Sequence, residues 1–218
     1  EEHNIQPLIT RLTTTLHDPY EILIIDDHSQ DNTKREVQTL MHHHKTIHFY
    51  QRNKKYGLAS AFHYGFSKAK GEIIIIMDAN LKHPPEIIPK LLHALTTCDI
   101  AKASGYFHGG GDQSLPPRRW IVHILNSITH SLLGGLHDYT SLFMAFHRNV
   151  INKIHFPTHA FHGEFIIEFL HKAHAAGLHI TEVPFVMQKR GRSKTKASPI
   201  ILLHYFKTVY KLARAHHA

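Results

Sequence analysis

The chain has 218 residues, of which 42% are hydrophobic and 19% charged, a composition typical of one globular domain and unlike that of disordered or fibrous proteins. It carries 25 lysine and arginine residues against 17 acidic residues, and this formal net charge of +8 favours a polyanionic partner. The single cysteine, Cys98, excludes an internal disulfide and argues against structural zinc. No stretch of the sequence approaches the roughly 18 uninterrupted apolar residues of a membrane-spanning helix.

Helical and strand patterns alternate over the first hundred residues. The run Ile73–Ile76, β-branched and without a polar interruption, predicts a buried strand. Around it the sequence predicts helices over 4–16, 33–41, 57–69 and 85–96, and further strands over 20–25 and 46–50. Strands that alternate with helices are typical of parallel βαβ units, so an α/β fold is expected.

The alternation weakens after residue 100. A glycine-rich loop at 109–111 precedes a predicted helix over 116–133. Beyond it the patterns predict a strand over 143–146, a helix over 164–175, a strand over 180–187 and a basic loop over 188–196.

Five polar segments stand in order along the chain: 25–33 (IDDHSQDNT), Asn53 with Gly57, Ala61 and Gly65, 78–85 (DANLKHPP), 138–144 (DYTSLFM), and 182–184 (EVP) followed by Arg190, Gly191, Ser193 and Lys194. Together they resemble the motifs of family 2 glycosyltransferases, and within that family the dolichol-phosphate or polyprenyl-phosphate mannosyltransferases. The resemblance covers nearly the whole chain, and the order of the segments makes chance a poor explanation.

The resemblance implies a GT-A-like, Rossmann-like domain with a mostly parallel central sheet flanked by helices. It places a donor-binding half at about 1–100, an acceptor half at about 101–198 and a basic amphipathic helix at 199–218. Family members begin with a strand and a turn, and residues 1–5 look like those just after that turn, so the first strand is expected to be absent from this sequence. Two strands of the sheet are therefore expected to lack a ladder partner.

The resemblance also implies a nucleotide-diphosphate sugar, GDP-mannose or UDP-glucose, as the donor. It assigns donor-binding roles to Asp26, Asp27, Asn53, Gly57, Asp78, Asn80, Lys82 and Ser104. Asp78 and Asn80 are the candidate ligands of Mg²⁺ or Mn²⁺, because hard oxygen donors suit these ions. The alternative roles of these acidic residues are a turn cap at Asp27 and a helix N-terminal carboxylate at Asp78.

Several positions depart from the family pattern. Asn80 replaces the second carboxylate of the metal motif, and Lys82 adds an ammonium that cannot ligate an ion. Gly105 and Met144 stand where the family has arginine. Two hypotheses follow for Lys82: its charge replaces part of the metal's, which makes catalysis weakly metal-dependent or metal-independent, or it is a solvated loop residue.

The implied acceptor is a polyprenyl phosphate. The residues assigned to its phosphate are Arg118, Arg119, Ser141, Arg190, Ser193 and Lys194, and the catalytic residues are Asp78, Asp138, Arg190 and Lys194. Since a phosphate is already anionic at neutral pH, positioning and charge stabilisation are expected to dominate the rate.

The C-terminal segment 199–218 has the pattern of a basic amphipathic helix, which either binds a membrane surface or packs on the domain. With a lipid acceptor, the expected location is the cytoplasm, peripheral at the cytosolic face of a membrane. A catalytically degenerate relative that binds nucleotide or membrane without transfer is the alternative function. Nucleic acid is not an expected partner, because no aromatic stacking motif accompanies the basic residues.

Overall fold

The computed structural model of the protein describes residues 1–157, 163–190 and 199–216. Its first half contains α1 (Glu2–Thr15), β1 (Ile22–Asp26), α2 (Thr33–His43), β2 (Ile47–Gln51), α3 (Leu58–Lys68), β3 (Ile73–Ile76), the 3₁₀ turn η1 (Pro85–Ile87) and α4 (Ile88–Ala94). Its second half contains β4 (Ile100–Ser104), β5 (Gly111–Asp112), α5 (Pro116–Leu133), β6 (Met144–His147), α6 (Asn149–Lys153), α7 (Phe165–Ala175), β7 (Ile180–Pro184), β8 (Val186–Met187) and α8 (Pro199–His216).

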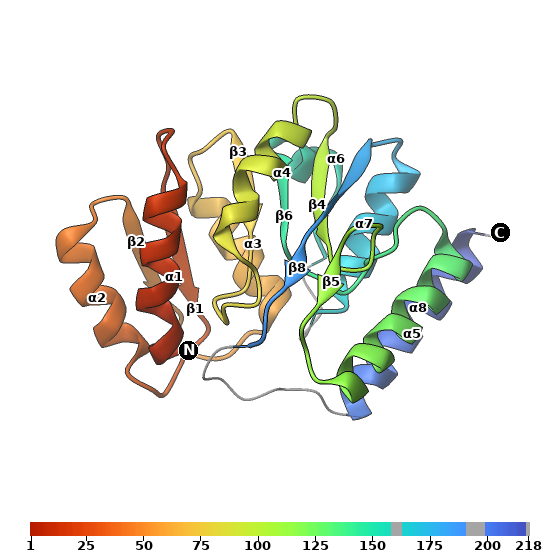
Figure 1. Cartoon of the computed structure of the whole chain (residues 1–218), viewed down its shortest axis with the longest axis horizontal. Helices are drawn as coiled ribbons and strands as arrows, with labels where there is room; N and C mark the ends of the chain where they lie inside the picture. The colour runs from red at the N-terminus through yellow and green to blue at the C-terminus, as the bar shows by residue number, and fades with distance from the viewer. Residues whose placement is uncertain (158–162, 191–198, 217–218) are drawn as a thin grey trace.

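The strands form a four-stranded sheet in the order β3-β6-β4-β7 and two small parallel pairs, β1-β2 and β5-β8 (Figure 1). Strand β6 is antiparallel to both of its neighbours, and β4 is parallel to β7. Strands β3 and β4 therefore run in the same direction, and the expected α/β architecture is confirmed with β6 as its antiparallel member.

The strand predicted over 180–187 is two strands in the structure. Ile180–Pro184 pairs with β4, whereas Val186 and Met187 pair with β5. The change of partner occurs at Phe185, whose N–H still donates to the carbonyl of Ser104 at 3.1 Å. A continuous apolar pattern does not reveal which neighbour a strand pairs with, so the sequence predicted one strand instead of two.

Strands β1 and β3 each have one edge without a ladder partner in the described part of the chain. β1 pairs with β2 alone, and β3 pairs with β6 alone. The pair β1-β2, with α1 and α2 beside it, forms the left-hand part of Figure 1.

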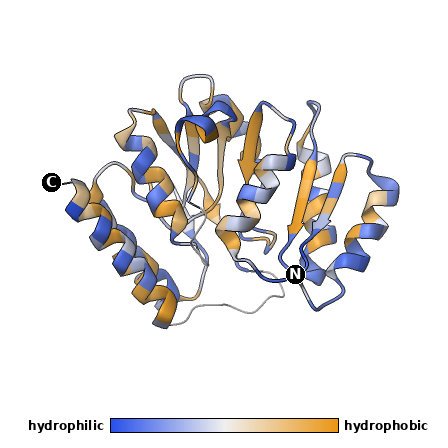
Figure 2. Cartoon of the chain, turned by 180° about the vertical axis from the view of Figure 1, so that it is seen from behind, coloured by the Kyte–Doolittle hydropathy of each residue, from blue (hydrophilic) through white to orange (hydrophobic). Residues whose placement is uncertain are grey.

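The sheet has apolar cores on both faces, and the alternation of side chains along β4 divides them. Ile100 belongs to the core that contains residues of α3, α5, α7 and α8. Ala101 and Ala103 belong to the opposite core, which α1 and α4 cover. Figure 2 shows the corresponding concentration of hydrophobic residues in the strands, between more polar helices. The predicted division into a donor-binding half before about residue 100 and an acceptor half after it stays a prediction.

Helices α5 and α8 lie side by side at the edge of the molecule (Figure 1). Tyr205, Val209 and Leu212 of α8 are buried in the same core as Leu125 and Leu133 of α5. Packing on the domain, one of the two alternatives for the C-terminal segment, is therefore observed. Over the described residues, no helix has both the length and the hydropathy needed to cross a membrane.

Candidate functional site

The candidate site lies where β3 and β4 end at the same edge of the sheet. Asp78 follows β3 by two residues, and Ser104 is the last residue of β4. Carboxyl ends of parallel strands are where α/β folds bind ligands. The charged residues described below gather at this edge and around the end of β1.

Asp26 closes β1 and is a structural anchor for the loop that follows. Its buried carboxylate accepts the N–H of Ser29 at 3.1 Å and the side-chain amide of Gln51 at 3.0 Å. The first bond holds the turn after β1, and the second ties β1 to β2. The role of Asp26 in donor binding stays a prediction.

Asp27 reaches the loop before α3. Its carboxylate accepts the backbone N–H groups of Tyr56 at 3.1 Å and Gly57 at 2.9 Å, and it pairs with Arg52 at 3.1 Å. Gly57 has a φ of +92°, a conformation that favours glycine, and the Tyr56 hydroxyl donates to Asn53 Oδ1 at 2.9 Å. The structure thus brings Asp27, Asn53 and Gly57 together in one corner, and their role in nucleotide binding stays a prediction.

A compact turn follows Asp78. The Asp78 N–H donates to His83 Nδ1 at 3.0 Å, and the Asn80 side-chain Nδ2 donates to Asp78 Oδ2 at 3.0 Å. The Lys82 N–H donates back to Asn80 Oδ1 at 3.1 Å, across Leu81 at a φ of +63°. Burial lowers the pKa of His83 to about 4, so this imidazole is neutral at pH 7.

The turn does not fit the divalent metal site that the sequence predicts. A metal site at this position needs two oxygens facing one ion. In the structure Asn80 turns its Nδ2 toward Asp78, and its oxygen is used by the Lys82 N–H. Within the described residues, no group of three or more His, Cys, Asp or Glu side chains is placed to hold a metal ion.

Lys82 points its charge into this edge of the sheet, which excludes the hypothesis of a solvated loop residue. The side chain is only 6% exposed. Burial, and then the neighbouring guanidinium of Arg118, lowers the pKa of Lys82 to about 8, while Asp112 and Asp78 oppose the shift. Arg190 also lies within electrostatic range, so three basic side chains converge here.

Asp138 is fully buried beneath the end of β4, where Ser104 is also buried. Its carboxylate accepts the N–H groups of Gly105 at 3.2 Å, Thr140 at 2.9 Å and Ser141 at 3.0 Å. These bonds organise the 138–141 loop against the strand. The catalytic role of Asp138 and the phosphate role of Ser141 stay predictions.

The basic residues predicted to bind the acceptor phosphate come from two segments. Arg118 and Arg119 lie in the first turn of α5, and Arg190 lies 3.8 Å from the carboxylate of Glu1. Ser193 and Lys194, with the rest of 191–198, lie outside the described residues.

Two charged residues of the site, Asp112 and Lys102, were not predicted from the sequence. Asp112 follows the glycine-rich loop, and its carboxylate accepts the hydroxyl of Tyr106 at 2.9 Å and the N–H of Ser114 at 2.7 Å. The glycine-rich loop was the available signal, because such loops let a backbone approach closely. Lys102 gave no signal, since a single lysine within a short apolar strand is not distinctive.

Lys102 is fully buried in β4, opposite Glu182 of β7. Its ammonium donates to the carbonyl of Ala103 at 2.9 Å. Burial lowers the pKa of Lys102, and the nearby carboxylates of Asp138 and Glu182 oppose that shift. Glu182 also accepts the Asp138 N–H at 3.1 Å, so these three charged residues form one buried network under the site.

Comparison with known proteins identifies the class of protein. Residues 1–155 match the family model described as glycosyl transferase family 2, and this chain belongs to that family. A dolichol-phosphate mannosyltransferase of Pyrococcus furiosus is 30% identical over 98% of this chain and 61% of its own length. A polyprenol monophosphomannose synthase of Mycolicibacterium smegmatis is 32% identical over 82% of this chain and 71% of its own. The chain thus spans about three-fifths of the Pyrococcus relative.

Solved structures share the fold. Glucosyl-3-phosphoglycerate synthase from Mycobacterium tuberculosis, in complex with Mn²⁺, UDP-glucose and phosphoglyceric acid, has a TM-score of 0.72 at 17% identity and covers 98% of this chain and 76% of its own. A mycobacterial protein has a TM-score of 0.72 at 18% identity and covers 98% of this chain and 71% of its own. These likenesses confirm the expected GT-A-like α/β fold.

Proposed function

We propose that this protein transfers a hexose, mannose in the first instance, from a nucleotide-diphosphate sugar to a polyprenyl phosphate with inversion. The observation that carries the proposal is the proximity of the Asp78 turn to a basic cluster of Lys82, Arg118 and Arg190 at the edge of the sheet, together with the Asp27 corner after β1. The names of the Pyrococcus and Mycolicibacterium relatives support mannose and a prenyl phosphate.

In the proposed reaction an oxygen of the lipid phosphate attacks the anomeric carbon of the sugar. The bond from that carbon to the donor's β-phosphate oxygen breaks, and the nucleoside diphosphate leaves. A single displacement inverts the anomeric configuration. Because the attacking oxygen is already anionic, the protein's task is to hold two anionic groups together and to stabilise charge on the departing diphosphate.

The residues divide between the two substrates according to position. Asp27, with Asn53 and Gly57 beside it, is proposed to bind the nucleoside of GDP-mannose or UDP-glucose. Asp78 lies at the donor's diphosphate end. Arg118, at the start of α5, is proposed to bind phosphate oxygens, for which the planar guanidinium offers paired donors.

We propose that a divalent cation, if it binds, binds weakly. Mg²⁺ or Mn²⁺ at this edge would find Asp78 as its single carboxylate in the turn, because the Asn80 oxygen is already engaged. A lone carboxylate is a poor site for either ion. The chain's own basic residues then have to supply much of the charge that meets the diphosphate.

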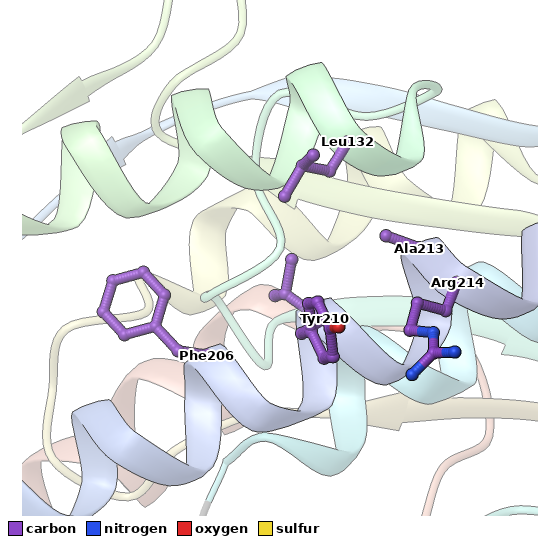
Figure 3. Close-up of a pocket in the computed structure, with 6 residues that line it drawn as sticks. Leu132, Phe206, Tyr210, Ala213 and Arg214 are labelled. Carbon is purple, nitrogen blue, oxygen red and sulfur yellow. The ribbon is translucent and has the colours of Figure 1, made fainter.

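A membrane surface is the proposed second partner, which a lipid acceptor requires. Helices α5 and α8 expose large apolar side chains, including Leu115, Trp120, Ile121, Ile124, Ile200, Leu203, Phe206 and Tyr210. A hollow of about 620 Å³ between the two helices is lined by Leu132, Phe206, Val209, Tyr210, Ala213 and Arg214 (Figure 3). Apolar groups beside Lys207, Lys211 and Arg214 are typical of helices that lie on anionic lipid. We place the protein at the cytosolic face.

Transfer of radiolabelled sugar from GDP-mannose or UDP-glucose to a short polyprenyl phosphate tests the proposal. The 218-residue chain is expected to label the lipid from one of the two donors, and a variant with Asp27→Asn is expected to label it more slowly. Binding of nucleotide without any transfer to the lipid would contradict the proposal and leave a nucleotide-binding relative.

A further inference from the structure

Lys82 is a buried cation whose ammonium contacts no anion in the described part of the chain. Its side chain is 6% exposed, yet no hydrogen bond or ion pair to its ammonium is found among the described residues. A buried ammonium that has lost water without gaining an acceptor is costly. Proteins tolerate such a group where a ligand supplies the missing anion.

The charges around Lys82 leave room for an anion. Arg118 donates to the hydroxyl of Ser114 at 2.9 Å and forms no ion pair with a described residue. The two carboxylates nearby are already engaged, because Asp112 accepts from Tyr106 and Ser114 while Asp78 accepts from Asn80. Within the described residues, neither carboxylate forms an ion pair with Lys82 or Arg118, so both cations lack an anion in direct contact.

The orientation of the Asn80 amide is determined by its two partners. Its oxygen must face the Lys82 N–H, because a flipped amide would place two donors against each other. Its nitrogen must therefore face Asp78, where a second carboxylate would instead present an oxygen to a shared ion. In this turn the hydrogen bond from Asn80 to Asp78 occupies the position where two ligand oxygens would bind a metal ion.

The net charge of this turn without an ion equals that of a two-carboxylate turn with a divalent ion bound. Two carboxylates and one divalent ion sum to zero. Asp78, the neutral Asn80 amide and the Lys82 ammonium also sum to zero. The replacement of a carboxylate by Asn80 and the presence of Lys82 are thus complementary changes.

We propose that the Lys82 ammonium, with Arg118, binds the diphosphate of the donor in the place of a divalent metal ion, so that nucleotide binding needs no metal. The inference rests on the proposed function and adds to it how the leaving diphosphate is stabilised. As the sugar bond breaks, negative charge grows on the β-phosphate, and a fixed ammonium is positioned to meet it.

Calorimetric titration of the 218-residue chain with GDP and with UDP tests this, in excess chelator and again with Mn²⁺. At least one nucleotide is expected to bind with the same affinity, within about twofold, in both conditions. The free Mn²⁺ signal in electron paramagnetic resonance is expected to fall no further with protein and nucleotide together than with the nucleotide alone, which itself chelates the ion. Lys82→Gln should weaken binding about tenfold or more, whereas Lys90→Gln, which removes an exposed lysine of α4, should leave it unchanged.

The variant Asn80→Asp supplies the reverse test. Its first oxygen can still accept the Lys82 N–H, and its second then faces Asp78. This variant, alone or with Lys82→Gln, is expected to bind Mn²⁺ and to gain nucleotide affinity from it. Should Lys82→Gln fail to fold by circular dichroism, the single Asn80→Asp variant still gives the answer.

The outcomes separate the two proposals. If nucleotide binds the natural chain only with Mn²⁺, the metal-free site is overturned while the proposed transferase function stands. If neither nucleotide binds in either condition, both are overturned.

Discussion

The hydroxyls of Tyr205 and Thr129 lie 2.7 Å apart in the interface between α8 and α5, and both side chains are buried. The carbonyl of Leu125 accepts from Thr129 at 2.9 Å and from Tyr205 at 3.3 Å, so either hydroxyl can be the donor between the two side chains. These contacts join the C-terminal helix to α5 through a small polar cluster inside an apolar interface.

Tyr205→Phe removes the Tyr205 hydroxyl from this cluster and keeps the ring. The variant is expected to lose about 1 kcal/mol of unfolding free energy, because the buried Thr129 hydroxyl and the Leu125 carbonyl each lose a hydrogen-bond partner. Urea denaturation measures the difference. Tyr210→Phe, an exposed position on the same helix, is the matched control and should change stability by only a few tenths of that amount. Equal effects of the two substitutions would show that the buried bond contributes nothing.

Asp27→Asn is expected to weaken nucleotide binding by roughly tenfold to a hundredfold. The substitution removes the charge paired with Arg52 and weakens the bonds that hold the backbone of Tyr56 and Gly57. Titration calorimetry with GDP and UDP measures the effect. Asp18→Asn, at an exposed position before β1, removes the same charge and should leave affinity unaltered. Unchanged binding in Asp27→Asn would remove Asp27 from the donor site.

His83 makes stability depend on pH between its two pKa values. Its side chain is 2% exposed, and burial lowers its pKa from 6.5 to about 4, so the unfolded chain binds a proton more readily than the folded chain in that window. Stability therefore falls as pH falls from 6.5 toward 4. The loss from this group between pH 7 and pH 5 is about 2 kcal/mol.

His83→Asn tests the pH dependence, because asparagine can still accept the Asp78 N–H but does not titrate. Urea denaturation at pH 7 and pH 5 should show a smaller loss on acidification in this variant than in the natural chain. His93→Asn, an exposed position at the end of α4, controls for the other histidines. If the His83 and His93 variants show the same pH slope, His83 does not carry the effect.

Trp120 reports on the membrane surface. It is the single tryptophan of the chain, it is 63% exposed, and it lies on the apolar side of α5. Anionic vesicles are expected to shift its fluorescence to shorter wavelength, and lipids brominated near the headgroup should quench it. Neutral vesicles serve as the control, since they lack the charge that attracts Lys207 and Lys211. An emission maximum that stays constant with anionic vesicles would exclude α5 from the contact.

Much of the fold follows from apolar periodicity. The predicted strand Ile73–Ile76 is β3 of the structure, and the spacing of Ile5, Leu8, Ile9 and Leu12 matches the buried side of α1. Periodicity reports which side of an element is buried but not its partner. The change of pairing at Phe185 was therefore missed, because it depends on the position of β5, a strand of two residues.

The sequence predicted which positions belong to the site. It did not predict which hydrogen-bond donors and acceptors face one another there. The motif segments predicted Asp27, Asp78 and Arg118 as site residues; in the structure Asp78 and Arg118 lie within electrostatic range of Lys82, Asp27 follows β1, and their roles stay predictions. The direction of the Asn80 amide depends on a left-handed backbone at Leu81, which no local pattern of residue types specifies. The buried network of Lys102, Asp138 and Glu182 depends on contacts between three separate segments, which only the folded chain brings together.

Helix α5 connects the proposed phosphate site with the proposed membrane surface in one rigid element. Its 18 residues span about 27 Å, with Arg118 in the first turn beside the phosphate site and Leu132 in the last turn at the hollow shared with α8. A helix that rests on lipid along its exposed side would fix the height of Arg118 above the bilayer. The reach of a lipid's phosphate into the site would then be set by the length and tilt of α5 rather than by the lipid's prenyl chain.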